Sequence, residues 1–225
     1  MNTTCSHTER IQNHQAMFPS DWIYQARRLA NVCNSLDDLK RSISSFEGCH
    51  IKTTATNTVF SDGNPHAKIM LIGEAPGINE DIQGIPFCGA SGVLLDKMLH
   101  AINLDRSQVY ISNTIFWRPP GNRKPTNLEL DICKPFVEKH IAIVAPNILI
   151  LVGGIACYNL LNITKTISVL RGRFYQYNNQ YLSHAITTSV IFHPAYLLRQ
   201  PTQKRVTWED LKKIKEYIDT WKNMN

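Results

Sequence analysis

Four short apolar segments, separated by segments of helical periodicity, limit the folds open to this chain more than any other feature. They lie at 68–73, 109–113, 148–153 and 189–192. A short, continuously apolar run is typical of a strand that is buried on both faces of a parallel sheet. Because strands that alternate with helices are joined by crossovers lying over the sheet, helices are expected on both faces. The sequence therefore predicts an α/β fold around a parallel sheet.

The periodic segments predict the helices and the extent of the folded domain. Helices are expected at 21–33, with Ser20 as N-cap, and at 36–46, 91–102, 127–144, 155–161 and 207–224. Thr126 and Glu129 have the spacing of a capping box at the start of the helix at 127–144. An edge strand is expected at 58–60. Since the first residues are polar and aperiodic, we expect a flexible arm at 1–20 and a single domain at 21–225.

Charge and cysteine content indicate which class of partner the protein binds and in which compartment it works. The chain has 225 residues, with 24 Lys and Arg against 18 Asp and Glu, and a net charge of +6. This excess favours a polyanionic partner such as nucleic acid. No apolar run approaches the roughly 20 residues of a membrane helix, and the first residues lack the pattern of a secretory signal, so a cytoplasmic protein is expected. The six cysteines include no Cys-x-x-Cys pair, and most are expected to be buried thiols.

Polar side chains follow three of the predicted strands, and ligands bind outside the carboxyl ends of strands in a parallel sheet. Glu74, Glu80 and Asp81 follow the first strand, Asn113 ends the second, and His193 follows the fourth. The carboxylates either bind a metal, orient a water or face solvent. The Asn113 amide either satisfies local backbone or presents its donor and acceptor to a base edge. His193 is either structural or a general acid or anion stabiliser.

Aromatic and apolar residues flank these polar side chains. Phe87 is either a core residue or a stacking surface for a base. Leu197 and Leu198 precede Arg199. This arrangement suits either a short helix that packs its leucines inward, or insertion into a base stack with the arginine on a phosphate. The second interpretation agrees with the basic charge of the chain.

The ordered set of these segments resembles the uracil-DNA glycosylase superfamily, and specifically its family-4, iron–sulfur type. The matching segments are 73–77 (GEAPG), 80–81 (ED), 84–89 (GIPFCG), 109–113 (VYISN), 118–123 (RPPGNR), 171–172 (RG) and 193–199 (HPAYLLR). The resemblance covers the chain from about residue 46 onward. It implies a three-layer α/β/α sandwich on a four-stranded parallel sheet. It also implies hydrolysis of the bond between uracil and deoxyribose in DNA, after the base is flipped out of the duplex.

The resemblance implies a role for each residue of the site. Phe87 would stack on the flipped uracil, and Asn113 would pair with its polar edge. His193 would stabilise negative charge on a uracil oxygen as the bond breaks. Glu74 and Glu80 would place the water or shape the pocket against the methyl group of thymine.

The neighbouring positions would shape the substrate pocket and dock the DNA. Ala75 stands where family-1 enzymes carry an Asp that orients water, so the partner of the water is expected elsewhere. Leu198, or Leu197, would fill the hole that the flipped base leaves in the duplex. The arginines expected to contact phosphates are Arg118, Arg123, Arg171 and Arg199.

The cluster ligands of family 4 are incomplete in this chain. That family holds a [4Fe–4S] cluster with four cysteines, the first two of which are spaced Cys-x-x-Cys. Here Phe46 and Trp117 stand at two of the four positions, and Cys49 and Cys133 remain at the others. Because such a cluster is normally held by four thiolates, we expect no cofactor. We expect these four side chains to form one local core instead.

Three functions agree with the sequence. The first is a monofunctional uracil-DNA glycosylase of base excision repair, a monomer that acts on DNA containing uracil. The second is a glycosylase for another deaminated base, hypoxanthine or xanthine. The third is a catalytically degenerate homologue that binds DNA, and the intact site residues disfavour it.

Overall fold

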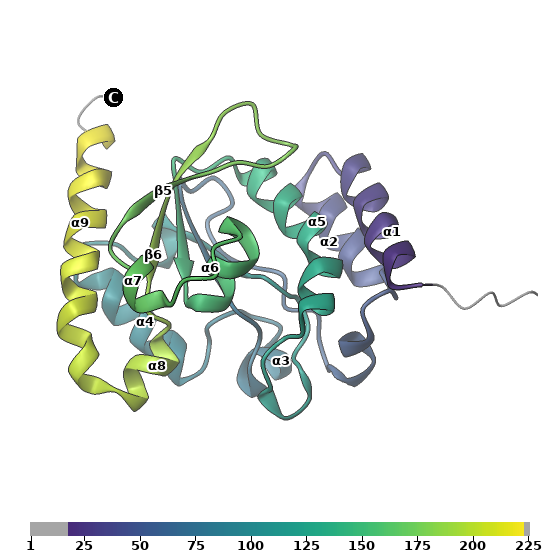
Figure 1. Cartoon of the computed structure of the whole chain (residues 1–225), viewed down its shortest axis with the longest axis horizontal. Helices are drawn as coiled ribbons and strands as arrows, with labels where there is room; N and C mark the ends of the chain where they lie inside the picture. Colours follow the sequence, from purple (N-terminus) through teal and green to yellow (C-terminus); the bar gives the residue numbers. More distant parts are fainter. Residues whose placement is uncertain (1–17, 223–225) are drawn as a thin grey trace, which may run out of the picture.

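Helices cover both faces of a central sheet in the computed structural model, which describes residues 18–222 (Figure 1). The sheet has six strands in the order β1-β3-β2-β4-β6-β5. The inner four are the predicted strands, and they run parallel: β3 (Tyr110–Asn113), β2 (Ile69–Gly73), β4 (Ile148–Val152) and β6 (Ile186–Ile191). All residues of β2 and β4 are buried, which is why their sequences are continuously apolar.

The prediction of a four-stranded, wholly parallel sheet is wrong at both edges, where an antiparallel strand is added. β1 (Asp62–Gly63) pairs with β3, and β5 (Phe174–Tyr177) pairs with β6. Three of the four residues of β5 are at least partly exposed, so it lacks the apolar run of the inner strands. The edge strand expected at 58–60 is also wrong. That segment lies outside the sheet, although the Val59 amide donates to the Phe116 carbonyl (2.8 Å).

The predicted helices are present, with small shifts of their ends. The α-helices of the described residues are α1 (Pro19–Val32), α2 (Leu36–Ser45), α3 (Ile78–Gln83), α4 (Ala90–His100), α5 (Asn127–Val144), α6 (Gly154–Leu161), α7 (Ile167–Leu170), α8 (Pro194–Arg199) and α9 (Lys204–Lys222). Short 3-10 helices lie at His50–Thr54 (η1), Arg106–Gln108 (η2), Pro120–Asn122 (η3) and Pro201–Gln203 (η4). No helix in the described part of the chain is long and apolar enough to span a lipid bilayer.

The capping residues explain where two of the helices begin. α1 starts before the predicted position, because Pro19 suits the first helical position and Phe18, not Ser20, is the N-cap. The capping box of α5 is confirmed: Thr126 Oγ1 accepts from the Glu129 amide (3.3 Å), and Glu129 Oε2 accepts from the Thr126 amide (2.7 Å). The arm predicted at 1–20 lies outside the described residues as far as residue 17.

Alternate residues of the inner strands point into two separate apolar cores, one on each face of the sheet. Met70 and Ile72 of β2 join the core formed with α1, α2, α5 and α6. Ile69 and Leu71 join the core formed with α4, α8 and α9. Figure 1 shows these two groups of helices on opposite sides of the sheet. The carboxyl ends of the parallel strands therefore open along one edge between the two helical layers.

Candidate active site

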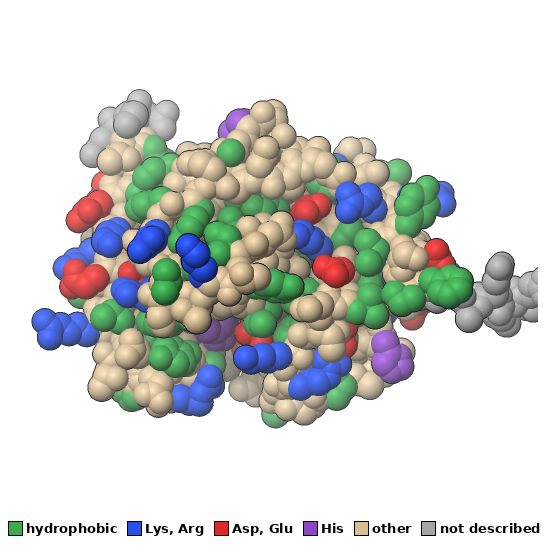
Figure 2. Space-filling view, viewed as in Figure 1, with side chains coloured by type: hydrophobic (Ala, Val, Ile, Leu, Met, Phe, Trp, Pro, Cys, Tyr) green, Lys and Arg blue, Asp and Glu red, His purple; other side chains and the backbone are tan. Residues whose placement is uncertain are grey.

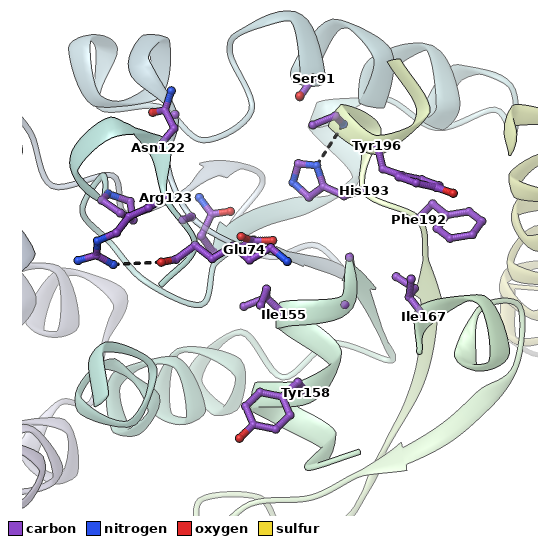
Figure 3. A pocket seen from close by; sticks show the side chains of 18 of the residues that line it. Glu74, Ser91, Asn122, Arg123, Ile155, Tyr158, Ile167, Phe192, His193 and Tyr196 are labelled. Carbon is purple, nitrogen blue, oxygen red and sulfur yellow. Dashed lines mark hydrogen bonds between the residues drawn. The ribbon is translucent and has the colours of Figure 1, made fainter. Parts of the chain in front are cut away.

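A cavity of about 830 Å³ opens at the carboxyl ends of the inner strands (Figure 3). The predicted site residues that line this cleft are Glu74, Ala75, Glu80, Phe87, Asn113, Arg123, His193 and Arg199. They come from the segments that follow β2, β3 and β6, and the parallel topology brings these segments together. The predicted residues that do not line it are Asp81, Arg118, Arg171, Leu197 and Leu198. Asp81 is buried, and its Oδ1 accepts from the amides of Thr56 (2.8 Å) and Asn57 (3.1 Å).

The Asn113 side chain is a buried amide at the end of β3, with 2% of the residue exposed. It lies against Gly73 of β2, where an added Cβ would be 2.4 Å from Asn113 Oδ1. Gly73 therefore leaves the space that the amide occupies. No hydrogen bond from the described residues engages this amide. Since buried amides are normally paired, its donor and acceptor are available to a ligand.

The His193 imidazole is neutral and lies in the wall of the cleft (Figure 3). Its Nδ1 accepts a hydrogen bond from the Ala195 amide (3.1 Å), which places the proton of the neutral ring on Nε2. Burial, with a smaller contribution from the positive charge of Arg199, lowers the pKa of His193 from 6.5 to about 4. At neutral pH the ring therefore presents a fixed, uncharged N–H donor.

The Glu80 carboxylate is occupied by backbone amides. Its Oε2 accepts from Gly77 (3.1 Å), and its Oε1 accepts from Cys88 (3.1 Å) and Gly89 (2.9 Å). These bonds tie the loop after β2 to the start of α4. Glu80 therefore shapes the cleft rather than presenting free oxygens to it.

Glu74 is the carboxylate whose oxygens remain available. It is half-buried in the cleft, and no group of the described residues donates a hydrogen bond to its carboxylate. Burial raises the pKa of Glu74, while Lys124 and Arg199 act in the opposite direction. Ala75, which also lines the cleft, has no side-chain group that binds water. Glu74 is thus the acceptor available for a water in the cleft.

Phe87 forms an apolar wall beside these polar groups. Its ring lies 5.5 Å from the His193 ring, at an interplanar angle of 27°. It packs over Gly73, where an added Cβ would be 2.5 Å from Phe87 Cζ. A flat apolar surface next to an amide and an imidazole suits a planar ligand with polar edges.

Basic side chains surround the cleft. Arg123, Lys124, Lys165 and Arg199 line it, and Figure 2 shows Lys and Arg side chains on both sides of the hollow between α8 and α3. Lys124 and Lys165 were missed in the sequence, because nothing distinguishes them from other surface lysines. Arg123 donates to both oxygens of Glu129 (2.8 and 2.5 Å), so its charge is partly compensated.

The structure gives Arg171 a structural partner away from the cleft. Its Nε and Nη2 donate to the two oxygens of Asp210 (2.6 Å each), and Nη2 also donates to the Val206 carbonyl (2.6 Å). These bonds fasten the turn before β5 to α9. Arg118 lies in the segment after β3, where it is partly exposed and donates to Asn122 Oδ1 (2.7 Å).

The two leucines of α8 have different environments. Leu197 is 1% exposed and packs in the core with α4 and α9, whereas Leu198 is 44% exposed. Of the pair, Leu198 is the one that a DNA duplex can reach.

The end of β4 contributes a part of the site that was not predicted. Gly153 and Gly154 begin α6 and line the cleft with Ile155 and Tyr158. Gly153 has a φ of +104°, and an added Cβ would lie 3.2 Å from His193 Cβ, so glycine allows the close approach. Applying the strand-end rule to the β4 segment would have found this pair.

The positions of the four cluster ligands of family 4 lie in one apolar core. Phe46, Trp117, Cys49 and Cys133 are 2, 1, 0 and 0% exposed. The neighbouring Cys49 thiol, together with burial, raises the pKa of Cys133. Cys133 is therefore a protonated thiol.

Aromatic packing fills the space around these thiols. The Phe46 ring packs edge-on against Phe136, with centroids 5.2 Å apart. The indole Nε1 of Trp117 donates to Thr58 Oγ1 (3.0 Å).

Among the described residues, no group of three or more His, Cys, Asp and Glu is placed to hold a metal ion. Since a [4Fe–4S] cluster is normally held by four thiolates, the residues present do not fit it.

Comparisons with known proteins identify the family of this chain. The family model described as the uracil DNA glycosylase superfamily matches residues 60–212. The chain belongs to this superfamily. It is similar to the type-4 uracil-DNA glycosylases of Archaeoglobus fulgidus (38% identity; 81% of this chain, 92% of the relative), Sulfurisphaera tokodaii (36%; 83% and 86%) and Thermotoga maritima (32%; 81% and 94%). The resemblance inferred from the motifs is thus confirmed, and the predicted site residues lie within the matched segment of this superfamily member.

Proposed function

We propose that this superfamily member is a uracil-DNA glycosylase of base excision repair, which works as a monomer on DNA containing uracil. The observation that carries the proposal is the pairing, in one cleft, of the buried unengaged amide of Asn113 with the fixed N–H of His193. An amide presents the donor and acceptor that the polar edge of uracil requires. The type-4 relatives support the choice of base.

Uracil leaves the sugar as an anion, so the catalytic task is to stabilise charge on its oxygens. We assign to Asn113 the recognition of the flipped base and to Phe87 the stacking surface beneath it. The Nε2–H of His193 donates to the oxygen on which negative charge develops. A preorganised donor of this kind acts in a water-poor cleft, where its interaction with the developing anion is strong.

The water that replaces uracil is assigned to Glu74. Its carboxylate accepts a proton of the water while the water oxygen bonds to the anomeric carbon and the bond to the uracil nitrogen breaks. Glu80, with both oxygens on backbone amides, keeps the loop in shape. Leu198 is the side chain proposed to fill the duplex, and Leu197 remains in the core.

The rate of uracil release is expected to rise with pH as Glu74 ionises. Because burial raises the pKa of Glu74, the midpoint lies above 4.5. His193, with a pKa of about 4, stays neutral at higher pH and adds no inflection near 6.5. Single-turnover rates between about pH 5 and 8 test this, and Glu74→Gln is expected to flatten the profile. An inflection near 6.5 that disappears in His193→Gln would contradict the neutral donor.

Neutralising Arg199 is expected to weaken binding to DNA of any sequence. Arg199 lines the cleft. Arg199→Gln is therefore expected to reduce the magnitude of the slope of the logarithm of the binding constant against the logarithm of the salt concentration by about one. The matched variant is Arg171→Gln, which breaks the pair with Asp210 and is expected to lower thermal stability without changing the salt slope. Binding titrations at several salt concentrations measure both. Equal slopes for the parent and both variants would refute the basic rim as a docking surface.

The proposed function is tested by base release from single- and double-stranded oligonucleotides that carry one modified base. Release of uracil, with an abasic site left behind and thymine untouched, is the expected result. Release of hypoxanthine or xanthine instead would assign the cleft to another deaminated base. Binding without release of any base would identify a degenerate homologue.

We also propose that the protein works without an iron–sulfur cluster. The support is the packing of Phe46 and Trp117, which fill the volume between the segments that a cluster would join. Burying a large apolar side chain contributes about 1.5–3 kcal/mol or more. Packing is thereby able to replace the cluster as the link between these segments.

A further inference from the structure

Phe87, the proposed stacking surface, has a backbone conformation that its own residue type does not favour. Its φ is +53°, in the left-handed region that non-glycine residues occupy at a cost of about 1–3 kcal/mol. The ring is 4% exposed and lies against Gly73 and His193. Neighbouring groups must therefore hold this residue in place.

Both ends of the peptide unit between Phe87 and Cys88 are bound by charged side chains. Arg106 Nη2 donates to the Phe87 carbonyl, and the Cys88 amide donates to Glu80 Oε1 (3.1 Å). A guanidinium on the oxygen and a carboxylate on the N–H both complement the dipole of that unit. Rotation of the peptide plane would break both bonds, so the pair fixes the ψ of Phe87.

Arg106 is itself held in position by three other groups. Its Nη1 donates to Asp62 and to the Pro86 carbonyl (3.3 Å), and its Nε donates to Asp96 Oδ1 (2.8 Å). Asp62 belongs to β1 and Asp96 to α4, so the guanidinium is fixed to the sheet and to a helix. The planar fork of arginine makes these bonds at once, which the single ammonium of lysine does not.

Gly92 of α4 also lies close to the Phe87 carbonyl. An added Cβ on Gly92 would lie 1.6 Å from the carbonyl oxygen. The Phe87 carbonyl oxygen is therefore close to Gly92 and bonded to the guanidinium of Arg106. A side chain at Gly92 would displace the carbonyl, and loss of the Arg106 guanidinium would release it.

We propose that Arg106 is a positioning residue for uracil release: it holds the Phe87 ring where a flipped base stacks, although it does not line the cleft itself. This inference rests on the proposed function. Misplacing a binding surface by about 1 Å is able to cost 10²-fold in rate. The effect should fall on the chemical step, because Arg106 lies outside the cleft and its guanidinium is paired with Asp62 and Asp96.

The test is a double-mutant cycle between Arg106 and Phe87. Arg106→Met is expected to lower the single-turnover rate at saturating enzyme about 10–100-fold, with the Kd for DNA within about twofold. Arg106→Lys keeps the charge and is expected to recover part of the rate. In a Phe87→Ala background, Arg106→Met is expected to lower the single-turnover rate by less than about threefold, because the two changes remove the same contact. Effects that multiply in the double variant would overturn the proposal.

Two further measurements separate positioning from general stability and from the proposed function. Lys215→Met removes an ion pair on α9, that with Asp219 (2.5 Å), and is expected to leave the rate unchanged. Hydrogen exchange at the Cys88 amide is expected to quicken in Arg106→Met and Arg106→Lys but not in Lys215→Met. Unchanged exchange in both Arg106 variants would overturn the proposal. A parent protein that releases no uracil would refute the proposed function, while the exchange measurement still decides the role of Arg106.

Discussion

Replacing His193 with alanine is expected to lower the single-turnover rate of uracil release by about 10²–10³-fold, the usual effect of removing one preorganised donor from a developing anion. The donor is preorganised because the Ala195 amide on Nδ1 (3.1 Å) keeps the ring proton on Nε2. Asn113→Ala is expected to have a similarly large effect, since the uracil edge then loses its buried partner. DNA binding is expected to change by less than about threefold, because phosphate contacts supply most of the affinity.

Single-turnover cleavage and equilibrium binding of one uracil-containing oligonucleotide measure these effects. Asn113→Asp keeps the side-chain volume but removes the N–H donors, so it separates pairing from packing. Val32→Ala, at an exposed position of α1, is the control variant, and its cleavage rate is expected to equal that of the parent. Cleavage by His193→Ala and Asn113→Ala within about threefold of the parent rate would contradict the assignment of both residues.

The inner sheet was predictable because its central strands encode their burial locally. β2 and β4 are apolar throughout, as strands with both faces covered usually are, and this pattern is visible without knowledge of the neighbours. The first half of β6 contains the polar residues Thr187 and Thr188, and only its second half was predicted. The edge strands are defined by a partner instead. Two residues, Asp62–Gly63, form β1 only by pairing with β3, and β5 has too much exposed surface to stand out in the sequence.

The location of the site was predictable from the sequence, but the role of each residue in it was not. The strand-end rule brings Glu74 and Glu80 to the same cleft, yet the two carboxylates look equivalent in the sequence. Only the folded loop shows that the Cys88 and Gly89 amides occupy Glu80 and leave Glu74 available. Arg171 raises the same difficulty, because its partner Asp210 is 39 residues away and has no motif of its own.

Trp117→Ala is expected to lower the free energy of unfolding by about 3–5 kcal/mol, the usual cost of truncating a large buried aromatic residue. Trp117 is 1% exposed, and its indole N–H is paired with Thr58. Chemical denaturation measures the change. The matched control is Trp208→Ala, because Trp208 is 40% exposed and surface substitutions usually change stability by about 0.5 kcal/mol or less. Equal losses in the two variants would contradict a structural role for Trp117.

The same core gives a second test at Phe46. An added Cβ on Gly48 would lie 2.3 Å from Phe46 Cζ and 2.4 Å from Trp22 Cε3, so Gly48 leaves the space into which the Phe46 ring folds. Gly48→Ala should displace that ring and destabilise the protein although it adds only a methyl group. A stability equal to that of the parent would show that the ring position is not essential.

Packing and a cluster predict opposite rankings of stability among variants of this core. If a cluster joined the segments, Cys133→Ala would remove a ligand and the iron with it, and would cost more than any aromatic truncation. If packing joins them, Cys133→Ala removes one small buried side chain, and Trp117→Ala is the more damaging change. We expect the second ranking, together with colourless protein after anaerobic purification. Stoichiometric iron and sulfide in that protein, lost on replacing Cys49 or Cys133, would overturn the cluster-free proposal.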